Sequence, residues 1–98
     1  MQRIHEQMRK GEEALLHLQH QINTFEENPT KEMKEQILGE MDTIIALIDS
    51  VRGVLNRLMK RTDLDIFERY NVEIALKSNE ILERDLKKEE QRVKKIEV

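Results

Sequence analysis

The sequence lacks cysteine and tryptophan altogether, and it contains one proline, three glycines and only 3% aromatic residues. Without cysteine the chain forms neither disulfides nor thiolate metal sites, which favours an intracellular, cytoplasmic location. The scarcity of aromatic residues predicts an aliphatic core in which the five methionines serve as adaptable filler. Because proline and glycine supply most turns, a 98-residue domain with so few of them has few elements, and each must be long.

The chain also lacks a strong excess of either charge, and it lacks long apolar runs. Charged residues make up 38% of the sequence, yet the net charge is only −3 and both signs are mixed along the chain. This mixture argues against a nucleic-acid partner, which would require a basic face. No apolar run approaches the roughly 20 residues that span a bilayer, so membrane insertion is not expected either.

The sequence does contain a run of apolar residues spaced alternately three and four apart, and this run occurs twice. Such spacing places one apolar stripe along each of two long helices, which then pack at a shallow angle. The first stripe consists of Ile4, Met8, Gly11, Leu15, Leu18, Ile22 and Phe25, and the second of Ile37, Met41, Ile44, Ile48, Val51, Leu55 and Leu58. We therefore predict an all-α fold with one domain, residues 1–98, which is an antiparallel up-down-up three-helix bundle with coiled-coil-like heptad packing.

Local signals set the expected ends of the helices. The residue before a proline avoids the α region, so the first helix should end at Asn28-Pro29, with Asn28 capping a second helix that begins at Pro29. Thr62 opens a sequence that resembles a capping box, which predicts a tight turn and then a third helix. The expected helices cover about residues 3–26, 29–61 and 63–96. A single continuous rod through Thr62 is the alternative.

The third predicted helix is patterned less regularly than the other two. Its apolar residues change register about halfway, which predicts a stutter in the heptad repeat. The first half uses Leu64, Phe67, Ile74 and Ile81, and the second half uses Leu82, Leu86, Val93 and Ile96. Polar residues recur every seven positions at Asn71, Ser78, Asp85 and Arg92. These four residues either dock a partner or fix the pairing register, or they face solvent after the stutter.

The predicted helices differ in length, and this difference indicates an interaction surface. If the first turn pairs Glu26 with Thr30, the start of the first helix lies opposite about Val54, and roughly two turns of the other helices project past it. An uncovered apolar cluster at that end would be unusual for a soluble monomer. The cluster would be covered by residues upstream of Met1, by a partner or by a second copy of the chain. Alternatively, the helix ends bend inward and cover it locally. The predicted partner-binding residues are Leu55, Leu58, Met59, Ile66, Phe67 and Tyr70.

Glu13, His17 and His20 share one outward face of the first predicted helix and are the best candidate ligands for a divalent ion. The helix supplies no fourth ligand, so these side chains are predicted to form a solvated surface. The sequence contains no glycine-rich phosphate loop and no plausible nucleophile arrangement. We therefore predict no catalytic residues, no metal, no cofactor and no small-molecule substrate.

The segment from Ile37 to Val51 loosely resembles the middle helix of three-helix adaptor families, among them GAT domains, BAG domains and spectrin-like repeats. The chain departs from BAG domains because no Arg-x-x-Arg-Lys motif opens the third helix, and from spectrin repeats because the first helix has no tryptophan. The predicted function is a non-enzymatic protein–protein interaction module, a helical-bundle adaptor or subunit that presents a helical surface to a partner. The alternatives are a homo-oligomeric coiled-coil structural or assembly protein and, as the resemblance implies, a GAT- or BAG-like adaptor domain.

Overall fold

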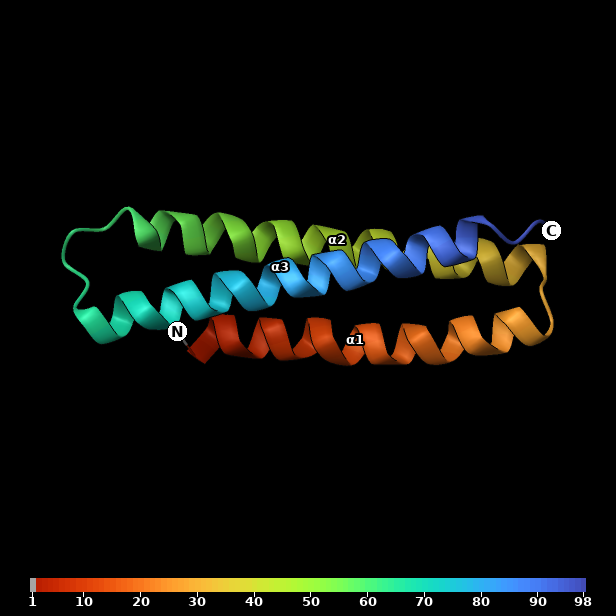
Figure 1. Ribbon diagram of the computed structural model, residues 1–98, viewed down its shortest axis with the longest axis horizontal. Coiled ribbons are helices and arrows are strands. Elements are labelled where there is room, and N and C mark those ends of the chain that lie inside the picture. The colour runs from red at the N-terminus through yellow and green to blue at the C-terminus, as the bar shows by residue number, and fades with distance from the viewer. Residues whose placement is uncertain (1) are drawn as a thin grey trace.

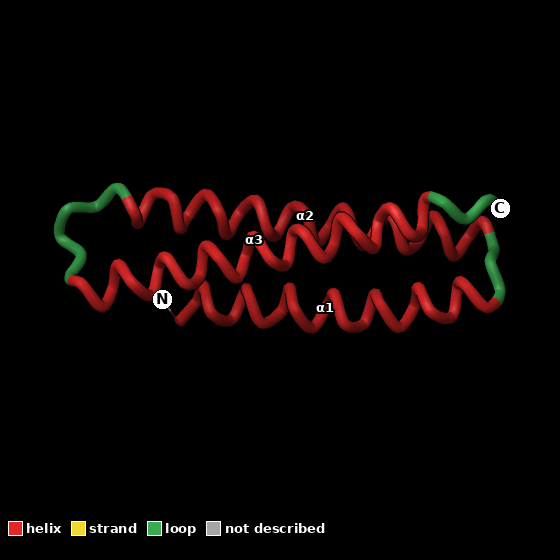
Figure 2. Tube along the Cα trace, viewed as in Figure 1, coloured by secondary structure: helices red, strands yellow, loops and turns green. Residues whose placement is uncertain are grey.

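The computed structural model describes residues 2–98 and contains the helices α1 (Gln2–Glu27), α2 (Lys31–Met59) and α3 (Ile66–Lys94). Figure 1 shows them running up, down and up along a rod with extents of 52 × 17 × 16 Å. Figure 2 shows one connection at each end of the rod and a short C-terminal tail. The predicted all-α, antiparallel three-helix bundle is confirmed, and α2 and α3 are separate helices rather than one rod.

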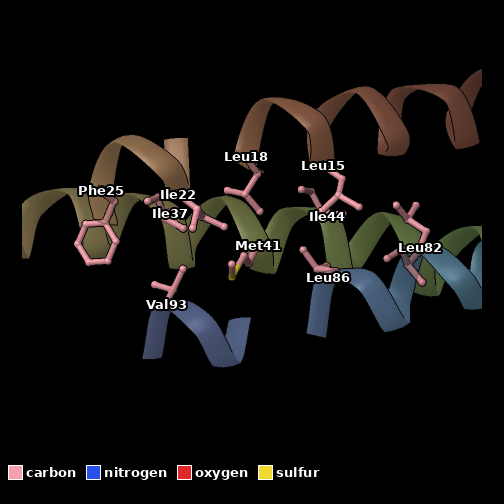
Figure 3. Packing of buried hydrophobic residues seen from close by; sticks show 11 residues of the cluster. Leu15, Leu18, Ile22, Phe25, Ile37, Met41, Ile44, Leu82, Leu86 and Val93 are labelled. Atoms are coloured by element: carbon pink, nitrogen blue, oxygen red, sulfur yellow. The ribbon is translucent and has the colours of Figure 1, made fainter. Parts of the chain in front are cut away.

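The two predicted heptad stripes of α1 and α2 form the core. All their members are buried or half-buried, and side chains from all three helices point toward a common axis in Figure 3. The larger of two clusters comprises Leu15, Leu18, Ile22, Phe25, Ile37, Met41, Ile44, Ile48, Leu82, Leu86 and Val93. The smaller cluster comprises Ile4, Val51, Leu55, Val72 and Ala75. Each fully buried aliphatic side chain contributes about 1.5–3 kcal/mol, so these stripes supply most of the stability of the bundle.

The predicted stutter in α3 is wrong. The buried residues of α3 follow one heptad phase from end to end, and they are Val72, Ala75, Asn79, Leu82, Leu86 and Val93. Phe67, Ile74 and Ile81 instead face solvent. Gly11 of α1 allows α3 to approach closely at Leu82, because a Cβ added at Gly11 would stand 3.0 Å from Cδ2 of Leu82.

Both predicted caps are wrong, although the helices lie where the stripes indicated. Thr30, not Asn28, caps α2, and its hydroxyl accepts a hydrogen bond from the backbone N–H three residues later at 3.2 Å. Asp65, not Thr62, caps α3, and its carboxylate accepts from the N–H three residues later at 2.8 Å. Both capping residues have the extended backbone that this hydrogen bond needs. The α2–α3 connection therefore spans residues 60–65 and is not a tight turn.

Candidate functional site

The end of the bundle that carries the α2–α3 connection extends beyond the start of α1 (Figure 1). Ile4, near the start of α1, belongs to the smaller core cluster together with Val51 and Leu55 of α2. The last turn of α2 and the first turn of α3 therefore lie past α1, as the difference in helix lengths predicts. We call this end, residues 58–70, the tip.

The tip exposes three large apolar side chains at the start of α3. Ile66, Phe67 and Tyr70 are 84%, 80% and 59% exposed, respectively. Leu58 and Met59 are half-buried, because they pack on the smaller core cluster. A hollow of about 250 Å³ lies at the start of α3, lined by Leu64, Asp65, Ile66, Arg69, Tyr70 and Glu73. Local packing thus covers part of the predicted cluster and leaves the start of α3 in solvent.

The inclusion of Leu55 among the partner-binding residues is wrong. Its side chain is fully buried in the smaller cluster, where Val72 and Ala75 of α3 also lie. The error follows from the wrong helical phase for the first half of α3, which turned these two residues away from α2. Leu55 is a core residue and offers nothing to a partner.

Polar contacts hold the α2–α3 connection against α3. Nε and Nη2 of Arg61 donate to the two carboxylate oxygens of Asp63 at 2.9 and 2.5 Å. This hydrogen bonding lowers the pKa of the Asp63 carboxyl. Arg69 reaches back from α3 and donates to the carbonyl oxygens of Arg61 at 3.0 Å and of Met59 at 3.4 Å. The exposed apolar side chains of the tip therefore follow a loop that is tied down by several hydrogen bonds.

Two ion pairs link neighbouring helices, and the sequence analysis identified neither of them. Arg52 of α2 donates to Glu83 of α3, and this hydrogen bond lowers the pKa of the Glu83 carboxyl. Arg92 of α3 donates to Glu26 of α1, and also to Oδ1 of Asn23 at 3.1 Å. Long charged side chains reach across helices in many directions, so spacing along one helix could not identify these partners.

The polar residues that recur every seven positions on α3 have different surroundings. Asn71 is exposed, whereas Ser78 and Asp85 are half-buried and line a hollow against α1. Arg92 is exposed and pairs with Glu26 of α1, so it contacts another helix of the bundle from the surface. Asn79, which the sequence analysis did not select, is the buried polar residue of α3.

The candidate metal ligands Glu13, His17 and His20 are exposed on α1. Within residues 2–98, no group of three or more His, Asp or Glu side chains is placed to hold a metal ion. None of the described helices is long and apolar enough to cross a membrane. The absence of a metal, a cofactor and membrane insertion stays a prediction.

Comparison with known proteins identifies the family. The model of the family described as mite allergen Blo t 5 matches residues 1–98. The chain belongs to this family of mite allergens. It is 74% identical to mite allergen Der p 5 of Dermatophagoides pteronyssinus over 98 residues, which cover all of this chain and 74% of that protein. It is 49% identical to mite allergen Blo t 5 of Blomia tropicalis over 88 residues, which cover 90% of this chain and 66% of that protein.

A solved structure of a relative matches the fold of this chain. The crystal structure of dust mite allergen Der p 5 matches with a TM-score of 0.87 and 74% sequence identity. The match covers 100% of this chain and 97% of that one. The bundle described above is thus the fold of the Blo t 5 family.

Membership in the Blo t 5 family overturns the predicted function. The family consists of allergens, so the chain is neither a GAT- or BAG-like adaptor nor a homo-oligomeric assembly protein. The error has a physical cause: heptad-patterned helix bundles serve many unrelated functions, and fold class does not identify one of them. The relatives are named as allergens and not as enzymes. The predicted partner and the predicted intracellular location stay predictions.

Proposed function

We propose that this protein is an allergen, an antigen whose folded surface is bound by antibodies of people sensitised to mites. The observation that supports this function is the 74% identity to Der p 5 over the whole chain. About a quarter of the positions differ, so an antibody footprint of about 20–30 residues shares most of its side chains with Der p 5. Antibodies against that relative should therefore bind this chain, with lower affinity where differing positions gather.

Antibody recognition of this protein should depend on the folded bundle. An antibody footprint buries about 800 Å² on the antigen, and a round patch of that area is about 32 Å across. The rod is only 17 Å wide, so such a footprint takes residues from at least two helices. Unfolding separates these helices and removes the epitope.

We propose the tip as one antibody-binding surface, with Ile66, Phe67 and Tyr70 as contact residues beside Leu58 and Met59. Large aromatic side chains are enriched among the residues that dominate protein interfaces. Here they stand at the end of the rod, past α1, where a partner can approach from the end and from the sides. The partner in this proposal is the combining site of an antibody.

The test is the binding of IgE from mite-sensitised donors to the immobilised chain. The folded chain should bind, and the same chain unfolded in urea should bind much less. A Phe67→Ser, Tyr70→Ser double variant should lose part of the signal with unchanged thermal unfolding, because both residues are exposed. Leu16→Ser is the matched control, since Leu16 is a large exposed apolar residue on α1, outside the tip.

The outcomes separate the two proposals. Absence of IgE binding to the folded chain overturns the allergen function. Full IgE binding by the double variant overturns the tip as an epitope and leaves the allergen function intact.

We also propose that the protein has no catalytic activity. The names of its relatives support this, and so does the direction of the displaced pKa values. The pKa is raised for Arg52, Arg61 and Arg92 and lowered for Asp63 and Glu83. Each of these shifts favours the charged form, whereas a general acid or base needs a pKa near the working pH.

A further inference from the structure

A second apolar stripe runs along α3, outside the core. Phe67, Ile74 and Ile81 are spaced seven residues apart, and all three are exposed. This spacing aligns them on one face of the helix at intervals of about 10 Å. Asn71 and Ser78 occupy the intervening heptad positions, so the stripe has the pattern of a second helix-pairing seam. The buried stripe of α3 packs in the core of the bundle, whereas this second stripe faces outward.

The second seam borders a groove between α1 and α3. Two adjoining hollows, of about 310 and 220 Å³, share Glu12 of α1 and Ser78 of α3 in their linings. Leu16 of α1 and Ile74 and Ile81 of α3 supply exposed apolar surface along the groove. The apolar residues of α3 recur every seven positions, which matches the repeat of side chains along one face of a second helix. An extended strand would instead place every second side chain in the groove.

The charged groups near the middle of the groove are acidic. The carboxylates of Glu12 and Asp85 both line the larger hollow. Asp85 has Nε of Arg84 at 3.8 Å, a long and largely solvated ion pair. Arg9 lines the smaller hollow, and its Nε lies 3.9 Å from a carboxylate oxygen of Glu13, a pair that is just as long and solvated. Basic groups on an occupant would therefore complement the larger hollow, where Glu12 and Asp85 lie, and acidic groups would be repelled there.

We propose that the groove between α1 and α3 binds a basic amphipathic helix as a peptide ligand. Apolar side chains of that helix lie on Leu16, Ile74 and Ile81, and its lysine or arginine side chains face Glu12 and Asp85. The site is separate from the core and does not depend on the allergen function.

The probe is a synthetic peptide of three heptads, with leucine at the first and fourth positions and arginine beside them. It is fluorescently labelled and titrated with the full chain by anisotropy. Saturable binding is expected, and Ile81→Glu should weaken it by about tenfold or more, because a charge then enters the apolar contact. Ile66→Glu is the matched control: it makes the same exchange on the same helix, at an exposed residue outside the groove.

Thermal unfolding establishes that both variants are folded before they are compared. Preserved binding in Ile66→Glu and weakened binding in Ile81→Glu supports the groove. Absence of binding to the parent chain, or equal affinity in the two variants, overturns the proposal.

A second pair of measurements tests the charges. Glu12→Gln combined with Asp85→Asn should weaken binding of the arginine peptide, and a matched peptide with glutamate in place of arginine should not bind the parent chain. Equal binding of the two peptides overturns the assignment of a basic ligand.

A second copy of this chain is the competing occupant, and sedimentation over a concentration series tests it. A molar mass that stays at the monomer value supports the peptide ligand. A dimer that forms with increasing concentration, and that Ile81→Glu dissociates, assigns the groove to self-association and overturns the proposal.

Discussion

Gly11 and Gly39 both lie inside helices, but only one of them is required by packing. A Cβ added at Gly11 would meet Cδ2 of Leu82 at 3.0 Å and Cδ2 of Leu47 at 3.6 Å. A Cβ added at Gly39 would meet nothing within 4 Å. The same substitution at the two positions therefore separates helix propensity from close packing between helices.

Gly39→Ala should raise the free energy of unfolding by about 1 kcal/mol, because alanine favours the helix. Gly11→Ala gains the same propensity but must displace Leu82 in the core, so its stability should rise less or fall. Urea unfolding with an unchanged m value measures both effects. An equal gain at the two positions would show that α1 and α3 can move apart near Gly11 with no loss in the free energy of unfolding.

Asn79 illustrates why the core of α3 could not be predicted residue by residue. It is 2% exposed, and its Nδ2 donates to the carbonyl oxygen of Ile48 at 3.1 Å. A buried amide without a partner costs about 1–3 kcal/mol, so the sequence alone favours Phe67 and Ile74 as core residues. The partner lies on α2, and which carbonyl oxygen faces Asn79 depends on how the two helices pack.

At the scale of the helices, the heptad pattern predicts that a buried stripe exists but does not always identify it. In α1 and α2 a single apolar stripe is present, and the prediction of the core holds from Ile4 to Leu55. In α3 two stripes share the same period, and the one with the larger side chains faces outward. The overhang at the tip followed from helix lengths, whereas the packing of Leu55 with Val72 and Ala75 required the correct phase of α3.

The start of α3 offers a test of the observed cap against the predicted one. Asp65→Ala should lower the free energy of unfolding by about 1 kcal/mol, because it removes the carboxylate that accepts from the N–H of Glu68. Thr62→Ala is the control and should change stability by less than about 0.5 kcal/mol. Chemical denaturation of both variants measures the difference, and a larger loss at Thr62 would restore the capping box predicted from the sequence.

The ion pair between α2 and α3 predicts a dependence of stability on pH. The hydrogen bond from Arg52 holds the pKa of the Glu83 carboxyl below its usual value of 4.5. The folded-state pKa is the lower one, so this pair stabilises the fold above about pH 4.5 and loses its effect as the pH falls through the folded-state pKa.

Glu83→Gln should therefore lower the free energy of unfolding at pH 7, by about 0.5–1 kcal/mol for a partly exposed pair. The difference from the parent chain should be smaller at pH 3, because protonation of the Glu83 carboxyl removes the ion pair as the pH falls. Urea unfolding at the two pH values measures it. Glu73→Gln, an exposed change on the same helix, is the control, and a difference that persists unchanged at pH 3 would contradict the assignment.

Over the whole molecule, the rod shape limits the depth of the core. The accessible surface of 6868 Å² exceeds the roughly 5,900 Å² expected for a compact monomer of the same mass. The radius of gyration of 15.9 Å likewise exceeds the roughly 13 Å of a compact domain of about 100 residues. A long and narrow bundle buries less surface per residue, and here the core divides into a larger cluster and a smaller one near the tip.

Stability should therefore be uneven along the rod. The larger cluster has eleven buried residues and the smaller one has five, and the smaller one adjoins the end that α1 leaves uncovered. Amides of residues 37–48 in α2 should resist hydrogen exchange more strongly than amides of residues 51–59 in the same helix, because local opening of the tip exposes less apolar surface. Native-state hydrogen exchange read by NMR measures this contrast within one helix. Equal opening free energies in the two segments would show that the two clusters unfold as a single cooperative unit.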